Sequence, residues 1–174
     1  SIDGVKSVKV VKTYYPAMNS AKDLTQAVET WKELGLKGEG MVVCIIDSGI
    51  DPNHKDMKIT DSSKAKLKKE NLKDGPGKYF TEKIPYGYNF ADENENIIDT
   101  HPKVDMHGMH VAGIVAANGS DEEVAKNEAI KGVAPEAQLL AMKVFSNNPN
   151  RQGAAEDDIV AAIEESVNQI GRAS

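Results

Sequence analysis

Residues 106–119 read MHGMHVAGIVAANG and place two histidines, His107 and His110, at the start of an apolar segment. Histidine changes its charge near neutral pH, so His107 could act as a general base that takes a proton from a hydroxyl nucleophile. The two histidines could instead bind a metal ion with Asp105, because residues three apart share one face of a helix. A third interpretation is structural, in which Asp105 caps a helix over 106–117 and both histidines simply pack.

The metal interpretation is the weakest of the three on sequence grounds. Helices that bind zinc more often carry histidines four residues apart with a glutamate between them. No further histidine or cysteine lies where it would complete the four ligands that zinc prefers. The structural and general-base interpretations therefore remain the main alternatives for this segment.

Asp47 is the acidic residue best placed to assist a histidine base. It ends the apolar segment MVVCIID (41–47), whose strand-forming residues predict a strand buried on both faces. In open α/β sheets ligands bind at the carboxyl ends of the strands, which is where this aspartate falls. A carboxylate in contact with an imidazole fixes its tautomer and stabilises its charged form. Asp47 and His107 are the candidate pair, and sequence physics alone does not prove that they meet.

The elements that must position this pair alternate between strands and helices, which predicts an α/β fold with a parallel sheet. Apolar segments predict strands at 41–47, 86–90 and 137–145, and residues 156–170 a helix with acidic residues in its first turn. Apolar residues at helical spacing form the stripe Leu24, Val28, Trp31 and Leu34 in a helix over 24–36, ended by Gly35, and the stripe Ile159, Ile163, Val167 and Ile170 in the last helix.

Small residues have predicted roles in the helix over 106–117. Gly108 lets another backbone approach beside His107, and Gly113 is expected to bring the helix close to the sheet. Asn118 and the glycine that follows it are expected to end the helix.

The remaining segments are expected to lie on the surface. Residues 1–20 show no periodicity and are predicted to run along the surface, and residues 119–132 are predicted to form a loop. Residues 58–85 are polar and rich in lysine, which predicts a surface excursion with one short helix.

Composition sets limits on the class of protein. The chain has 174 residues, enough for one domain with a real core, and 40% of them are hydrophobic. A net charge of −6 argues against nucleic acid as a partner, because binding phosphates needs a basic surplus. No apolar segment reaches the ~20 residues that cross a bilayer. Cys44 is the only cysteine, so no internal disulfide can form, and its apolar neighbours predict a buried structural thiol.

Three segments together resemble the signatures of the subtilisin-like serine proteases. They are VVCIIDSGIDPNH, HGMHVAGIVAANG and GVAPEAQLLAMKV, in the order in which that family has them. The spacing of 60 positions from Asp47 to His107, with the segments YYP, KGEGMVV, PYGYNFAD and HGMH, resembles the cell-envelope proteinases of Gram-positive bacteria, of the lactocepin and C5a peptidase type. The resemblance implies the N-terminal half of a subtilisin-like α/β catalytic domain over residues 1–174.

The same resemblance implies roles for individual residues. Asp47 corresponds to the aspartate and His107 to the histidine of an Asp-His-Ser triad, while His110 corresponds to a structural histidine. Asp51 and His54 fall in the turn after the aspartate, where loop-holding roles are expected. A structural calcium ion is compatible with the family, without an identifiable ligand set here. No other cofactor is expected.

The match to the family ends before its nucleophile. The oxyanion asparagine and the serine turn of the GTSMA type are absent, and the serines at 48, 146, 166 and 174 lack that context. The expectation is a secreted, cell-wall-attached endopeptidase of proteins or peptides. Its serine would lie on a C-terminal chain that pairs with the exposed sheet edge, unless the chain pairs with itself. A non-catalytic binding fragment and a metal-dependent hydrolase are the alternatives.

Overall fold

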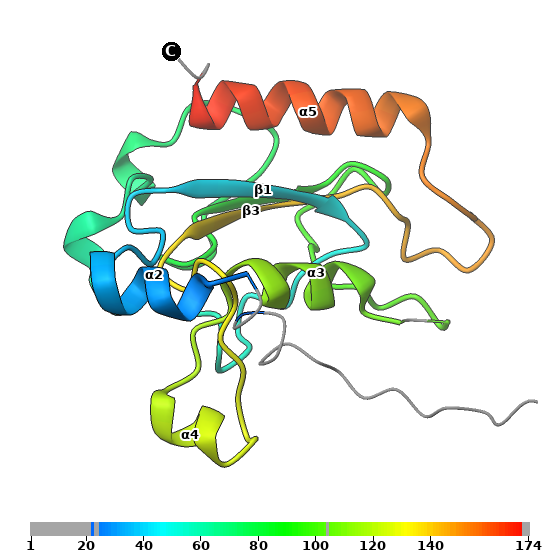
Figure 1. Ribbon diagram of the computed structural model, residues 1–174. Coiled ribbons are helices and arrows are strands. Elements are labelled where there is room, and N and C mark those ends of the chain that lie inside the picture. Colours follow the sequence, from blue (N-terminus) through cyan, green and yellow to red (C-terminus); the bar gives the residue numbers. More distant parts are fainter. Residues whose placement is uncertain (1–21, 23–24, 104, 172–174) are drawn as a thin grey trace, which may run out of the picture.

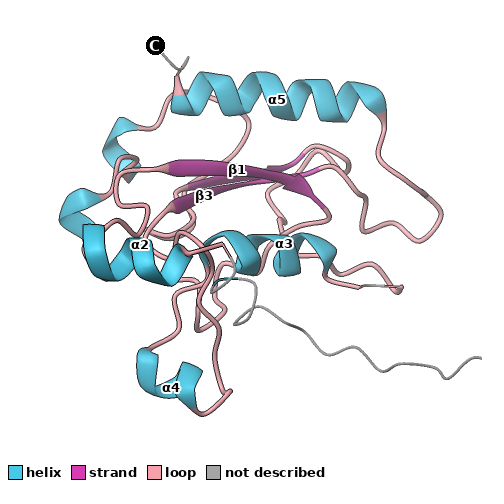
Figure 2. Cartoon of the chain, in the orientation of Figure 1, coloured by secondary structure: helices cyan, strands magenta, loops and turns pink. Residues whose placement is uncertain are grey.

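The computed structural model describes residues 22, 25–103 and 105–171, so the expected surface segment over 1–20 lies outside the described residues. Three strands form one sheet in the order β1-β3-β2: β1 (Val42–Asp47), β2 (Tyr86–Asn89) and β3 (Gln138–Lys143). Both pairings are parallel, which confirms the predicted α/β class. Helices α3 (His107–Ala116) and α5 (Glu156–Ile170) cover opposite faces of the sheet, as Figures 1 and 2 show.

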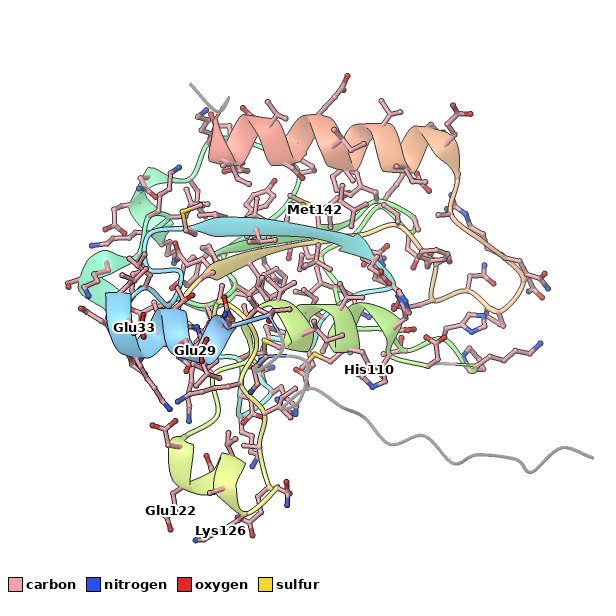
Figure 3. The ribbon with its side chains drawn as sticks, viewed as in Figure 1. Glu29, Glu33, His110, Glu122, Lys126 and Met142 are labelled. Carbon is pink, nitrogen blue, oxygen red and sulfur yellow. The ribbon has the colours of Figure 1, made fainter. Side chains whose placement is uncertain are left out.

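The central strand β3 carries the core on both of its faces. Leu139 and Ala141 point into the cluster beneath α3, whereas Leu140 and Met142 point into the cluster beneath α5. Met142 accordingly lies between the sheet and α5 in Figure 3. Every residue of β3 is buried, as an apolar strand with neighbours on both sides requires.

Strand β1 is less buried than its sequence predicts. Only Ile45 is fully buried, and the other five residues are partly exposed. The reason is its position at the edge of the sheet, where among the described residues it pairs with β3 alone. Cys44 points toward α5, where its thiol lies 2.8 Å from the Ser166 hydroxyl, and burial raises the pKa of this thiol to about 11. The prediction of a structural thiol is consistent with that position.

Helix α5 has the predicted bounds, but the face that it buries differs from the predicted stripe. Its buried residues are Ala162, Ser166 and Gln169, which face the sheet. The polar Gln169 is satisfied there, since its side chain accepts a hydrogen bond from the Lys73 nitrogen and donates one to the Lys73 carbonyl oxygen. Most of the apolar stripe predicted to be buried is exposed: Ile159 36%, Ile163 49% and Val167 45%, with Ile170 packed against the core. The described residues leave this stripe uncovered.

Helix α3 corrects three details of the sequence analysis. Its N-cap is Met106, not Asp105, and it ends at Ala117 in an extended rather than a left-handed conformation. Gly113 faces the loop residue Ile130, so it does not bring the helix against the sheet. Gly132 brings its own loop close to the end of α3, since an added Cβ there would lie 2.5 Å from the Ala116 nitrogen.

The outer elements are short. Helix α2 (Ala27–Leu34) ends at Gly35 as predicted, but its stripe is poorly buried, with Leu34 66% exposed. The expected loop over 119–132 contains α4 (Asp121–Ala125), capped by Ser120, and it projects away from the sheet in Figure 1. The polar segment over 58–85 contains two 3-10 turns, Ser62–Lys64 and Lys69–Asn71, instead of one helix.

Within the described ranges, no helix is both long and apolar enough to cross a membrane.

Candidate active site

Asp47 and His107 lie in contact at the carboxyl end of the sheet. Asp47 is the last residue of β1, and His107 is the first residue of α3. The Nδ1 atom of His107 is 2.9 Å from each carboxylate oxygen of Asp47. A carboxylate can only accept in this contact, so Nδ1 carries the proton and Nε2 is the nitrogen that can take another. The contact expected from the sequence is therefore present.

The two partners differ in their exposure to solvent. The Asp47 side chain is 16% exposed and the His107 side chain 65%. The hydrogen bond with Asp47 and then its negative charge raise the pKa of His107 above the ordinary value of 6.5. The carboxylate thus favours the protonated ring, which is the form that a general base adopts after it has taken its proton.

The residues before His107 hold its backbone in place. Asp105 does not cap the helix at the position expected for it, but its Oδ1 accepts a hydrogen bond of 3.0 Å from the His107 nitrogen. Met106 between them has φ 56°, in the left-handed region that side chains other than glycine seldom adopt. Strained backbone of this kind often lies at functional sites, and here it sets the direction in which α3 begins.

Ser48 joins the end of β1 to the start of α3. Its backbone nitrogen donates to Asp47 Oδ1 at 2.7 Å, and its hydroxyl accepts from the Gly108 nitrogen at 3.1 Å. A Cβ on Gly108 would lie 2.6 Å from the Gly49 carbonyl oxygen, so only glycine permits this approach. The glycine after His107 therefore has the role predicted for it, and the approaching backbone is that of Gly49.

A cavity of about 490 Å³ opens beside the pair. Asp47, Ser48 and His107 form part of its lining. One wall is formed by Asp99, His101, Lys103 and Asp105, and the other by residues between Phe145 and Gly153, which follow β3. Its volume falls within the range of small-molecule and peptide side-chain pockets. The candidate base thus faces a space that a substrate can enter.

A polar network joins the two walls of this cavity. Asn147 accepts from the Thr100 nitrogen at 2.9 Å and donates to the Ile98 carbonyl at 3.1 Å, which links both walls directly. Asp92 accepts from the Asn147 nitrogen at 2.8 Å and from the Ser146 hydroxyl. Burial acts to raise the pKa of Asp92, but these hydrogen bonds outweigh it and lower the pKa. The network thus connects the two walls by hydrogen bonds.

Other residues singled out in the sequence lie outside the contact. Asp51 Oδ1 accepts from the Asn53 nitrogen, and His54 Nδ1 accepts from the Asp56 nitrogen, so both hold the turn as expected. His110 lies exposed on the outer side of α3 (Figure 3), and the structural role that the resemblance implied for it stays a prediction.

The metal interpretation has no ligand cluster to support it. The part of the chain that the structure describes contains no group of three or more histidine, cysteine or acidic side chains that could hold a metal ion. One carboxylate oxygen, Asp56 Oδ1, is buried without a hydrogen-bond partner, which by itself does not make a calcium site. A structural calcium ion stays a prediction.

Sequence reasoning missed the supporting residues of the site. No sequence pattern singles out Ser48, Asp92 and Asn147, because their roles depend on contacts between segments far apart in the chain. Lys143 had a visible signal, since it is a charged residue inside the apolar segment AQLLAMKVF. Its side chain is fully buried and its Nζ donates to the Ser48 carbonyl at 2.5 Å.

Comparison with known proteins places this geometry in a family. The chain is 46% identical over 170 residues to the PI-type proteinase of Lactococcus lactis subsp. cremoris, covering 95% of this chain and 9% of that protein. It is 34% identical over 125 residues to the C5a peptidase of Streptococcus pyogenes serotype M3, covering 67% of this chain and 10% of that protein. The chain thus spans about a tenth of these relatives.

A solved structure has the same fold. The CspB protease of Clostridium perfringens superposes with a TM-score of 0.50 at 21% identity, covering 86% of this chain and 32% of that one. The family model named Subtilase family matches residues 38–172, a range that includes both Asp47 and His107. Since that match extends over most of the chain, the protein belongs to the subtilase family of serine proteases.

Proposed function

We propose that this chain supplies the aspartate and the histidine of an Asp-His-Ser triad in a subtilisin-like endopeptidase. The observation that carries the proposal is the Asp47–His107 contact of 2.9 Å at the edge of an open cavity. Membership of a serine-protease family makes peptide-bond hydrolysis the reaction that fits such a pair. The substrate would be a protein or peptide.

The proposed reaction assigns one step to each group. Nε2 of His107 takes the proton of a serine hydroxyl as its oxygen attacks the peptide carbonyl. Asp47 accepts from Nδ1 throughout, so it keeps the tautomer fixed and stabilises the imidazolium that forms. His107 then gives the proton to the leaving amine. The ring's exposure leaves room for a nucleophile and a substrate.

The nucleophile is proposed to come from the downstream part of the peptidase domain. The described serines that line the cavity already have other partners: Ser48 accepts from Gly108, and Ser146 donates to Asp92. The uncovered stripe on α5 and the unpaired edge of β1 are surfaces that additional strands and helices would cover. The serine-bearing partner is proposed to occupy both surfaces.

The location of the parent protein is also a proposal. The relatives from Lactococcus lactis and Streptococcus pyogenes are a proteinase and a peptidase of Gram-positive bacteria. Their similarity favours a secreted protease attached to the cell wall.

Reconstitution tests the proposed function. The chain would be co-expressed with the segment of the lactococcal PI-type proteinase that follows its aligned region, and cleavage of a fluorogenic peptide would be measured. We expect cleavage from the pair of chains and none from either chain alone. His107→Ala should abolish the cleavage, whereas His110→Ala, on the exposed side of the same helix, should leave it intact.

The same preparation tests the proposed partner surface. Alone, the chain should bind a hydrophobic dye or self-associate through its exposed stripe, and the second chain should suppress both. Ile163→Glu should reduce dye binding by the isolated chain and weaken the assembly. A chain that assembles with its partner but does not cleave would indicate a binding fragment, and a sharply unfolding monomer without dye binding would contradict the partner claim.

A further inference from the structure

Lys143 is a fully buried cation beneath the candidate active site. It ends the central strand β3, and its exposed fraction is 0%. In the register of the sheet it is the direct neighbour of Asp47 on β1 and of Asn89 on β2. An ammonium group taken out of water costs several kcal/mol unless nearby groups compensate for the lost hydration.

Ser48 is the group that links this cation to the pair above it. The Lys143 Nζ donates to the Ser48 carbonyl at 2.5 Å. The same serine donates its backbone N–H to the Asp47 carboxylate and accepts the Gly108 N–H with its hydroxyl. One residue therefore connects the buried ammonium to the carboxylate and to the first turn of α3.

Three carboxylates surround the cation and compensate for its burial. Burial lowers the pKa of Lys143, and the charges of Asp99, Asp92 and Asp47 oppose that effect in decreasing order. Asp92 belongs to the network that joins the cavity walls, and Asp99 lines the cavity. The ammonium is thus the shared counter-charge of the catalytic aspartate and of both walls.

A second buried lysine, Lys83, serves as a comparison, because it is buried like Lys143 but lies away from the cavity. Lys83 is 1% exposed, and its Nζ donates to the Pro135 carbonyl at 2.6 Å. Its acidic neighbour is Glu136, and none of the cavity-lining residues is among its described partners. Lys83 is accordingly a matched control, with the same side chain and burial but a different set of neighbours.

We infer that Lys143 is a positioning residue of this site, which holds the Ser48 carbonyl and through it fixes the Asp47 carboxylate against the ring of His107. Its role in turnover rests on the proposed function. It does not touch the reacting atoms, so its removal should loosen the pair without removing either member of it. Substrate binding depends on other parts of the cavity and should change little.

The first experiment needs no activity and uses this chain. NMR would record the low-field Nδ1–H resonance of His107 in the wild type, in Lys143→Met and in Lys83→Met. We expect the resonance to be lost or broadened in Lys143→Met and retained in Lys83→Met. If Lys143→Met does not fold, Lys143→Gln, which keeps a donor without the charge, takes its place, and a weakened resonance is again expected. An unchanged resonance in the folded Lys143 variant would overturn the inference.

The second experiment measures turnover in the assembled peptidase. Lys143→Met should lower kcat by about 10–100-fold with KM unchanged, the size of effect seen when metal-binding residues lose their outer hydrogen-bond partners. Lys83→Met should leave both constants at their wild-type values. Equal losses in the two variants, or a change in KM alone, would reduce Lys143 to a structural residue. A wild-type assembly without activity would instead refute the proposed function, and the NMR comparison would still decide the inference.

Discussion

The two ends of the sheet use the same kind of side chain for different purposes. At the carboxyl end, buried Lys143 binds the Ser48 carbonyl, and the contacts lead from there to an exposed imidazole and an open cavity. At the amino end, buried Lys83 binds the Pro135 carbonyl. Glu136 beside it accepts hydrogen bonds from the nitrogen and hydroxyl of Thr60 and from the Asn118 side chain.

The polar groups at the amino end hold the fold, whereas those at the carboxyl end are arranged around a candidate catalytic residue. The network at the amino end joins loops to one another, and its donors and acceptors satisfy each other inside the protein. The network at the carboxyl end terminates at His107, whose ring is 65% exposed. Substitutions at the amino end should therefore change stability, and substitutions at the carboxyl end should change turnover.

The largest expected effect is on turnover at the carboxyl end. Asp47→Asn in the assembled peptidase should lower kcat about 10⁴-fold, because the amide favours the wrong tautomer of the histidine. Asp51→Asn, at the nearby acid that only holds a turn, should leave kcat close to the wild-type value. Steady-state kinetics on both variants measures this, and similar losses in the two would remove the special role of Asp47.

The next effect is on stability at the amino end. Glu136→Ala should lower the free energy of unfolding by about 3 kcal/mol, because it leaves the buried side-chain donor of Asn118 without an acceptor and also removes the hydrogen bonds to Thr60. Urea unfolding of this chain measures the change, with the exposed Glu122→Ala as the control. A stable Glu136→Ala variant that loses the Nδ1–H resonance of His107 would contradict the division between the two ends.

The pH dependence of the free energy of unfolding tests the stabilising role of the amino end. Burial lowers the pKa of Lys83 to about 8, and the charge of Glu136 only partly opposes this. The unfolded chain, with a lysine pKa of about 10.4, then binds more protons than the native chain, so stability should rise with pH between about 8 and 10.4. The rise from this group is on the order of 3 kcal/mol. Lys83→Met should reduce it, and an unchanged slope in urea unfolding at pH 8, 9 and 10 would show that Lys83 is charged in the folded state.

Local sequence pattern predicts the strands, the helices and the candidate catalytic pair. The apolar segment that ends in Asp47 predicts a strand, and the segment after Met106 predicts a helix, so the pair could be named before its contact was known. Parallel strands and helices on both faces follow from the same alternation. These features depend on residues that are neighbours in the chain, which is why pattern alone finds them.

The parts that sequence pattern misses depend on contacts between distant segments. The apolar stripe on α5 predicts a buried face, but Ile163 and Val167 are exposed among the described residues. The exposure of β1 follows from its position at the sheet edge, which pattern does not specify. The partner of Lys143 is 95 residues away in the chain, so its role emerges only once β1 and β3 pair.

The titration of His107 in this chain tests the central claim most directly. The hydrogen bond with Asp47 and its charge raise the pKa of His107, so its chemical shift should titrate above the value of about 6.5 for a free histidine. Stability from this pair is fully present below pH 6.5 and is lost as pH rises through the raised pKa. NMR of the wild type and of Asp47→Asn, with the four histidines assigned by single substitutions, should show the pKa falling toward 6.5 in the variant. A His107 pKa at or below 6.5 that Asp47→Asn leaves unchanged would contradict the account.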